Sequence, residues 1–190
     1  NAPDGYHGYW IEDFYRVEEE FGTMDDLHHL IEEAHKRDMK VILELVTNYV
    51  SETHPFASDP DKQHWFKDEV QFERTPSTTW LDHVKVLDQE EEEVITYLLD
   101  VAHYWLSETD IDGYKINDAD RSAPAFISRL TESLKETYPD KYILAGCSVS
   151  CDDIEALKNL DTIDAIEDRD WLEQLVEILA KPGEFISDLN

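Results

Sequence analysis

Four polar side chains at the ends of short apolar runs raise the question of what chemistry this sequence supports. Glu44 stands in one run, Lys115 and Asn117 stand in a second, and Cys147 closely follows a third. Together they offer a carboxylate, a fixed positive charge, an amide and a thiol. The amide carries no negative charge, so Asn117 cannot form a covalent ester with a substrate. The thiol has an ordinary pKa of about 8.5, which is poorly matched to donating a proton at neutral pH.

The runs that carry these residues are typical of strands in an α/β fold. We expect strands over 40–46, 112–117 and 141–145, with a possible fourth over 162–166. Helical segments separate them, and strands that alternate with helices form a parallel sheet covered by those helices. Parallel strands end at one edge of the sheet, so the four polar side chains should cluster there although they are far apart in sequence. Asn117 should lie between the first and third strands.

Helical periodicity is strong between these strands. We expect Thr23 to cap the first helix, the acidic run 90–93 to form the first turn of the second, and Ser122 with Pro124 to open the third. The apolar stripes are Leu27, Leu30, Ile31 and Ala34; Val94, Leu98, Val101, Ala102 and Trp105; Ile127, Leu130 and Leu134; Leu172, Leu175, Val176 and Leu179; and, more weakly, Ile154 with Leu157.

The net charge of the chain argues against nucleic acids and anionic membranes as partners. The chain has 16 Lys and Arg against 45 Asp and Glu, which gives a formal charge of −29. Phosphates and anionic lipids would be repelled, so we expect no nucleic-acid partner, and no apolar run is long enough to span a membrane. The acidity suits an extracellular or high-salt setting, although composition alone does not establish either. Cys147 and Cys151, spaced C-x3-C, predict ordinary thiols rather than a zinc site.

The length of the chain suggests one domain over residues 1–190. The 190 residues hold roughly half of an eight-unit barrel, which usually needs about 250 residues. The opening at Asn1, with no initiator Met or leader, indicates a piece of a larger protein. The connection over 47–88 is unusually long and rich in aromatic residues and His, so we expect a short subdomain-like loop there.

Several linked motifs occur in one order along nearly the whole chain, and together they resemble the α-amylase family of glycoside hydrolases. The resemblance implies a (β/α)8 barrel with a small subdomain after its third strand. It also implies cleavage or transfer of α-glucosidic bonds with retention, by a carboxylate nucleophile and a carboxylic acid. The segments that carry it read YHGYW at 6–10, DFY at 13–15, FGT at 21–23, DDL at 25–27, AHKR at 34–37, KVILELVTNYV at 40–50, YWL at 104–106 and DIDGY at 110–114.

The catalytic motifs of that family are altered here. The first, Asp-x-Val-x-Asn-His, reads ELVTNY, with Glu44 for Asp and Tyr49 for His. The second, Gly-Phe-Arg-x-Asp, reads GYKIN, so Lys115 replaces Arg and Asn117 occupies the nucleophile position. Cys147 follows the Gly after which the family carries its acid. A motif near the seventh strand is absent. We therefore expect no intact catalytic residues and a partial TIM-type barrel without hydrolase activity.

Other positions keep the family pattern. His7, Tyr9 and Trp10 match residues that line the sugar site, where aromatic faces stack on sugars; packing of the barrel top is the alternative. Asn48 matches a calcium ligand of many family members, although a turn-capping Asn is the more ordinary role. No other cofactor is implied. Asp118 follows the nucleophile position directly and, if the strand continues, should point to the opposite face and miss the site.

Two functional hypotheses follow. The first is a catalytically inactive α-amylase-like module that binds an α-glucan, another oligosaccharide or a protein. The alternative is a retaining glycoside hydrolase or transglycosylase that is active only with missing barrel units. Asn117 and Cys147 favour the first, because added units cannot replace residues already present. The open edges of a partial barrel need cover, so a homodimer or a remaining barrel half is an expected partner.

Overall fold

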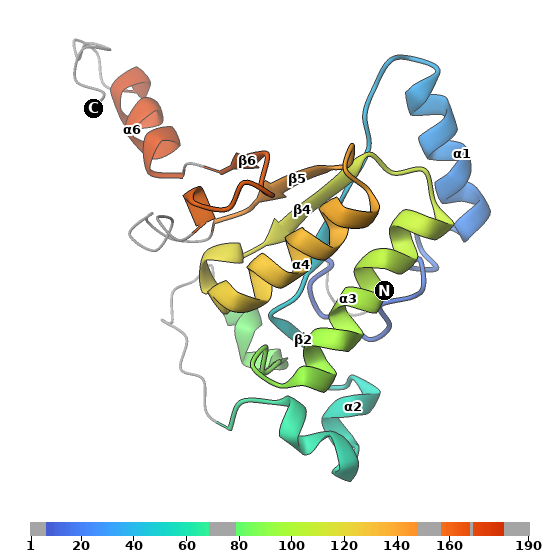
Figure 1. Cartoon of the computed structure of the whole chain (residues 1–190), viewed down its shortest axis with the longest axis vertical. Helices are drawn as coiled ribbons and strands as arrows, with labels where there is room; N and C mark the ends of the chain where they lie inside the picture. The colour runs from blue at the N-terminus through green and yellow to red at the C-terminus, as the bar shows by residue number, and fades with distance from the viewer. Residues whose placement is uncertain (1–6, 69–78, 148–156, 168, 181–190) are drawn as a thin grey trace.

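The computed structural model describes residues 7–68, 79–147, 157–167 and 169–180. Its centre is a parallel sheet of the order β1-β4-β5-β6. The strands are β1 (Ile42–Val46), β4 (Gly113–Asn117), β5 (Tyr142–Ala145) and β6 (Ala165–Ile166). The predicted strands and their parallel arrangement are therefore confirmed, with the fourth shorter than expected, and β4 lies between β1 and β5 (Figure 1).

The register of the sheet places the polar residues side by side. Glu44 of β1 pairs with Lys115 of β4, and β4 pairs in turn with β5. Gly113 opens β4 where the strand passes very close to its neighbour: a Cβ there would lie 1.9 Å from the carbonyl oxygen of Tyr142. Only glycine fits such an approach, so this residue fixes where β4 meets β5.

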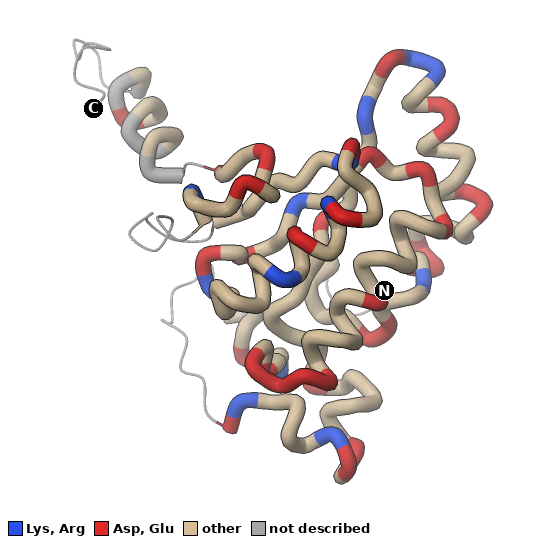
Figure 2. Tube along the Cα trace, in the orientation of Figure 1, with Lys and Arg blue, Asp and Glu red and all other residues tan. Residues whose placement is uncertain are grey.

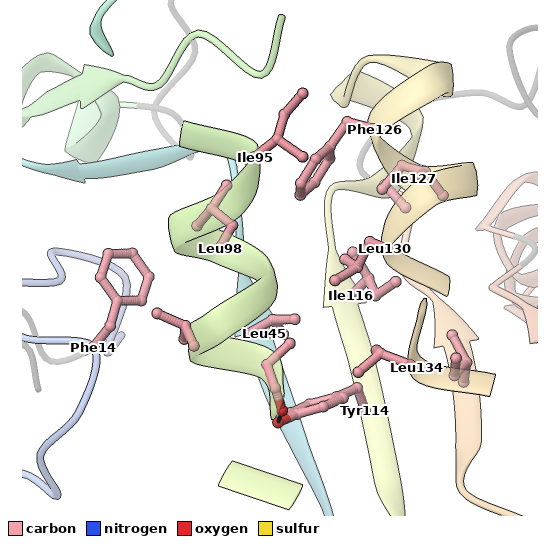
Figure 3. Close-up of a cluster of buried hydrophobic side chains, with 14 of the residues drawn as sticks. Phe14, Leu45, Ile95, Leu98, Tyr114, Ile116, Phe126, Ile127, Leu130 and Leu134 are labelled. Atoms are coloured by element: carbon pink, nitrogen blue, oxygen red, sulfur yellow. Dashed lines mark hydrogen bonds between the residues drawn. The ribbon is translucent and has the colours of Figure 1, made fainter. Parts of the chain in front are cut away.

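One face of the sheet is covered by α3 (Glu92–Glu108) and α4 (Pro124–Thr137). Leu98 of α3 and Leu130 of α4 are fully buried, and their side chains meet residues that rise from β1 and β4, such as Ile116 (Figure 3). The hydroxyl of Tyr114 donates to the carbonyl of Ala102 at 2.6 Å, which satisfies a polar group within this core. Burial on this face contributes about 1.5–3 kcal/mol per large side chain.

The opposite face of the sheet is covered mainly at its carboxyl end among the described residues, where Val46 packs with Tyr49 and Leu81 of the connection that follows β1. Ile42 and Tyr142 lie on it with 38% and 44% of their surfaces exposed. Parallel sheets are normally buried on both faces, so this exposure marks a fold that is open on one side.

The remaining helices agree with the sequence except at one end. Thr23 caps α1 (Met24–His35) in a capping box with Asp26. Of the expected acidic turn over 90–93, Glu92 and Glu93 lie in the first turn of α3, whereas Glu91 is its N-cap and Glu90 precedes it. Pro124 opens α4 as predicted, but the capping residue is Ala123. Ser122 was expected to open this helix, and its hydroxyl instead donates to the side chain of Asn48 at 2.9 Å. The stripe of Leu172 to Leu179 lies on α6 (Arg169–Ala180), while most of the weaker Ile154–Leu157 helix falls outside the described residues.

The connection over 47–88 contains its own small structure. Strands β2 (Tyr49–Ser51) and β3 (Val84–Val86) pair antiparallel. Between them lie α2 (Pro55–Ser58) and the 3-10 helices η1 (Pro60–Trp65) and η2 (Thr79–His83); a third, η3 (Ala119–Arg121), follows β4. As a subdomain boundary, 47–88 stays a prediction. The pairing returns the chain to the end of β1, so Tyr49 stays close to the sheet.

Acidic residues are distributed over all the surface elements rather than gathered in one patch, as Figure 2 shows along the Cα trace. The densest run is the start of α3. Within the part of the chain that the structure describes, no helix combines the length and apolar character needed to cross a membrane.

Candidate active-site region

Three of the four predicted site residues meet at the carboxyl ends of β1 and β4. Nδ2 of Asn117 donates to Oε1 of Glu44 at 2.9 Å, and Nζ of Lys115 lies 3.6 Å from the same oxygen. The register of the two strands causes this, because residues two apart on a strand share a face. The predicted clustering of Glu44, Lys115 and Asn117 is therefore confirmed.

Tyr49 holds the other end of the Asn117 amide. Its hydroxyl lies 2.7 Å from Oδ1 of Asn117 and 3.0 Å from Oδ2 of Asp118, and it donates its single proton to this pair of acceptors. Burial of the ring and the charge of Asp118 raise the pKa of the Tyr49 hydroxyl, so it stays a neutral donor. The amide of Asn117 is thus fixed between Tyr49 and Glu44.

Asp118 lies inside this cluster, which corrects the expectation that it would miss the site. Strand β4 ends at Asn117, and Asp118 adopts a left-handed conformation with φ of +46°. The alternation of side chains that holds in a strand stops there, so both neighbours reach one hydroxyl. Burial raises the pKa of the Asp118 carboxyl, against the opposing effects of Tyr49 and Arg121.

Lys115 is held by a second carboxylate that sequence reasoning missed. Its Nζ lies 3.3 Å from Oε2 of Glu167, just after β6, as well as near Glu44. Partial burial opposes the charged form, but these two carboxylates raise the pKa of Lys115 overall. The sequence position of Glu167 could have identified it, because Glu167 directly follows the possible fourth strand and the carboxyl ends of parallel strands lie at one edge of the sheet. Gly146 leaves room for the chain of Lys115: a Cβ there would lie 2.8 Å from its Cε.

Cys147 comes at the same end of the sheet. It directly follows Gly146, whose amide donates to Ile116 at 2.8 Å and whose carbonyl accepts from Ala119 at 2.8 Å. Its side chain is buried, with 4% of its surface exposed. A buried thiol is a weak proton donor to any substrate in solution. Cys151, the other half of the C-x3-C pair, lies outside the described residues.

The three predicted sugar-binding residues form one aromatic group beside Glu44. The hydroxyl of Tyr9 lies 3.4 Å from each carboxylate oxygen of Glu44. The ring of His7 stacks on Tyr9 at 5.4 Å and meets Trp10 edge-on at 4.9 Å. Burial lowers the pKa of His7, which favours a neutral ring at physiological pH. These partly buried rings therefore border the polar cluster.

Asn48 takes part in a buried hydrogen-bond network instead of facing the cluster. Its Oδ1 accepts from Gln89 at 3.0 Å and from Ser122 at 2.9 Å, and its Nδ2 donates to the carbonyl of Asp118 at 3.0 Å. Gln89 also accepts from the amide of Ala123, at the start of α4. The network ties the end of β1 to the starts of α3 and α4.

The contacts of Asn48 give no support to a calcium site. Calcium takes six to eight oxygen ligands, usually with carboxylates, whereas this side-chain oxygen already accepts two hydrogen bonds. Within the described ranges, no group of three or more His, Cys, Asp or Glu side chains could hold a metal ion. Asn48 as a calcium ligand stays a prediction, and no step below depends on a metal.

The sequence of this chain is similar to those of known α-amylases. Residues 1–86 match the family described as α-amylase, catalytic domain. The chain is 29% identical over 141 residues to α-amylase 2 of Dictyoglomus thermophilum, covering 72% of this chain and 25% of that protein. It is 28% identical over 201 residues to a maltogenic α-amylase of Bacillus acidopullulyticus, covering 97% of this chain and 34% of the relative.

The structural match is more extensive. The crystal structure of an α-amylase from Geobacillus thermoleovorans, complexed with acarbose, superposes with a TM-score of 0.83 at 39% identity, over 95% of this chain and 42% of that one. The class is thus an α/β protein whose parallel sheet is part of a TIM-type barrel. The chain is a relative of the α-amylase family of glycoside hydrolases, so the resemblance is confirmed, and it spans a quarter to a third of the curated relatives above.

Proposed function

We propose that this chain is a non-catalytic α-amylase-like module that binds α-glucan oligosaccharides. The observation that carries the proposal is the state of Asn117. Its amide is neutral and is hydrogen-bonded at one end to Glu44 and at the other to Tyr49. Retaining hydrolysis needs a free carboxylate at the nucleophile position, with an acid about 5–5.5 Å away. A fixed amide supplies neither the charge nor the freedom to attack.

The proton donor is also lacking at its family position. Cys147 is 4% exposed, so its thiol is not accessible to the leaving oxygen of a sugar in the site. Lys115 places a point charge between two carboxylates, where the family carries an arginine that can bind bidentately. Sugar orientation would therefore differ even if a nucleophile were supplied.

The binding half of the proposal rests on the aromatic group. Tyr9 and Trp10 are partly exposed beside Glu44, so their rings can stack on a sugar while the carboxylate accepts from its hydroxyls. The solved relative with acarbose supports an oligosaccharide built on glucose as the first ligand to test. The rest of the sugar site is not represented in the described strands, so we expect weak binding.

Activity is tested first, with the purified chain and nitrophenyl α-glucosides or maltooligosaccharides. We expect no turnover above that of a heat-denatured sample. Turnover that disappears in Asn117→Ala would contradict the proposal, because it would place catalysis at this residue. The double variant Asn117→Asp, Cys147→Glu should also stay inactive, because a misplacement of about 1 Å can reduce a rate about a hundredfold.

Binding is tested by titrating maltotriose and acarbose while following tryptophan fluorescence and amide chemical shifts. Tyr9→Ala should abolish the response, whereas Tyr9→Phe keeps the ring and should retain most of it. Equal binding by wild type and Tyr9→Ala would remove the aromatic group from the proposal. No response from the wild type at millimolar sugar would reject glycan binding altogether.

A hydrolase that needs further barrel units is the second candidate, and Asp118 is the observation that favours it. Its carboxyl is partly buried with a raised pKa, and it lies 3.0 Å from the hydroxyl of Tyr49, next to Asn117. Such a group is suited to donate a proton. If a longer form of the chain shows turnover, loss of that turnover in Asp118→Asn and its retention in Asn117→Ala would support this candidate over the first.

A further inference from the structure

A buried side-chain amide is linked to the polar cluster through one intermediate residue. Gln89, just before α3, is 4% exposed. Its Oε1 accepts from the backbone amide of Ala123 at 2.8 Å, and its Nε2 donates to the carbonyl of Thr47 at 2.9 Å. Nε2 also donates to Oδ1 of Asn48 at 3.0 Å. Gln89 therefore joins the end of β1 to the start of α4.

The backbone fixes the direction in which the Gln89 amide points. An N–H group such as that of Ala123 can only donate, and a carbonyl such as that of Thr47 can only accept. The side-chain oxygen of Gln89 must therefore face Ala123, and its nitrogen must face Thr47. A reversed amide would place donor against donor and acceptor against acceptor at a buried position, where unpaired polar groups are costly.

The orientation of Gln89 in turn decides the orientation of Asn48. Because Nε2 of Gln89 can only donate, the atom of Asn48 that faces it must be the oxygen. The nitrogen of Asn48 then donates to the carbonyl of Asp118 at 3.0 Å and reaches that of Asn117 at 3.4 Å. Ser122 also donates to Oδ1 of Asn48, but a hydroxyl can accept as well as donate and would fit either orientation. Gln89 is thus the partner that selects one of them.

The carbonyl that Asn48 holds belongs to the left-handed residue after β4. Asp118 has φ of +46° and ψ of +45°, a conformation that Asn and Asp adopt more readily than other non-glycine residues. This backbone conformation brings the Asp118 carboxyl to 3.0 Å from the hydroxyl of Tyr49. In an extended conformation the side chain would point away from that of Asn117. The hydrogen bond from Asn48 therefore acts on the backbone feature that brings Asp118 into the cluster.

We propose that Gln89 is a positioning residue of the polar cluster. It orients the amide of Asn48, and Asn48 holds the carbonyl of Asp118 so that the left-handed turn keeps the Asp118 carboxyl on Tyr49. The direction of every hydrogen bond in this chain is set at its start by the backbone amide of Ala123. The inference goes beyond sugar binding, because it concerns what sets the geometry of the site rather than what occupies it.

The test is Gln89→Glu, a nearly isosteric change that removes the two donors. The new carboxylate can still accept from Ala123, but its second oxygen faces the carbonyl of Thr47 and Oδ1 of Asn48. We expect the Asn48 amide to turn over and donate to this carboxylate instead. The NMR scalar coupling across the hydrogen bond from Nδ2 of Asn48 to the carbonyl carbon of Asp118 should be present in the wild type and lost in the variant. The backbone chemical shifts of Asp118 should leave the left-handed range.

Ser122→Ala is the matched control. It also removes a buried hydrogen bond to Oδ1 of Asn48, but it leaves the orientation that Gln89 imposes. The coupling and the shifts of Asp118 should therefore stay those of the wild type. A general loss of stability would affect both variants, so the difference between them isolates positioning.

A second variant, Gln89→Met, keeps the test decisive if Gln89→Glu does not fold. It carries no charge and removes the selection without reversing it, so the coupling should fall clearly below that of the wild type. A full coupling in the folded Gln89 variants would overturn the proposal. So would its loss in Ser122→Ala, or a reversed Asn48 amide beside an Asp118 that stays left-handed. These measurements need no sugar, so their failure is distinguishable from a failed titration with maltotriose.

Discussion

The helix-covered face of the sheet and its open face are built from alternate residues of the same strands, yet they differ in packing, charge and exposure. Leu45 and Ile116 point to the covered face and are at most 5% exposed. Ile42 and Tyr142 point the other way and are 38% and 44% exposed, with Glu44 and Lys115 beside them at the carboxyl end. The covered face holds the fold together, and the open face carries the groups that chemistry would use.

This difference explains how a site can change while the fold persists. The covered face needs apolar volume, and α3 and α4 supply it whatever residues occupy the other side. Substitutions at Asn117 or Lys115 leave that packing intact, because their side chains lie on the opposite face. The sheet can therefore keep a geometry like that of the solved α-amylase from Geobacillus thermoleovorans while the polar residues of its open face vary.

Among these predictions, the largest difference in the free energy of unfolding is expected between Leu130→Ala and Tyr142→Ala. Leu130 is fully buried under the sheet, so its truncation should lower the free energy of unfolding by about 2–5 kcal/mol. Tyr142 is nearly half exposed, and the same truncation should lower it by less than about 1 kcal/mol. Urea denaturation at low protein concentration measures both. Equal losses would show that the open face is packed as tightly as the covered one.

Acid should lower the free energy of unfolding through His54, which is buried in the hydrophobic core. This residue is 3% exposed near Phe14 and Phe56, and burial lowers the pKa of its ring to about 4. The unfolded chain then binds a proton that the folded chain refuses, so stability falls as the pH drops from about 6.5 to about 4, by on the order of 2 kcal/mol.

The matched variant is His54→Asn. His54 caps α2 by accepting from the amide of Phe56 at 3.1 Å, and Asn is a good residue at that position. The variant keeps the helix cap but has no titrating imidazole, so its free energy of unfolding should vary much less between these pH values. Thermal unfolding across that range measures it. An unchanged slope in His54→Asn would assign the acid sensitivity to other groups.

A smaller, opposite pH effect is expected on the open face from Asn117→Asp. The new carboxylate would lie about where Nδ2 now lies, 2.9 Å from Oε1 of Glu44, so repulsion raises its folded-state pKa. The folded state then holds a proton that the unfolded chain releases, and stability falls as the pH rises above about 4, by about 1–2 kcal/mol at neutral pH. Asn117→Ala is the control, since it removes the amide without adding a titrating group and should show no such slope.

The smallest effect is expected for Lys115→Met. Removing the ammonium leaves Glu44 and Glu167 without the cation between them, but Lys115 is 30% exposed, so the loss should be below about 1 kcal/mol and should shrink at high salt. Lys85→Met, at an exposed position of β3, makes the same charge change as a control. A loss of several kcal/mol would mean that the open face is less solvated than its exposure indicates.

Local patterns predicted the elements well, because each depends on short-range chemistry. The stripe of Leu27 to Ala34 and the cap at Thr23 identify α1, and alternating strand and helix patterns identify the parallel sheet. Helix ends were harder: Ser122 has the chemistry of a cap, but a partner distant in sequence, Asn48, takes its hydroxyl. Competition of this kind is invisible along the chain.

By itself, the sequence determined the α/β class, the family relationship and the neutral amide at Asn117, because these follow from residue types, their periodicity and their order. Only the tertiary structure decided that Asp118 joins the site, that Glu167 reaches Lys115, and that Tyr49 and Glu44 hold the Asn117 amide at both ends. These contacts depend on strand register, on one left-handed residue and on the exact end of β4. Such features arise when distant segments pack together.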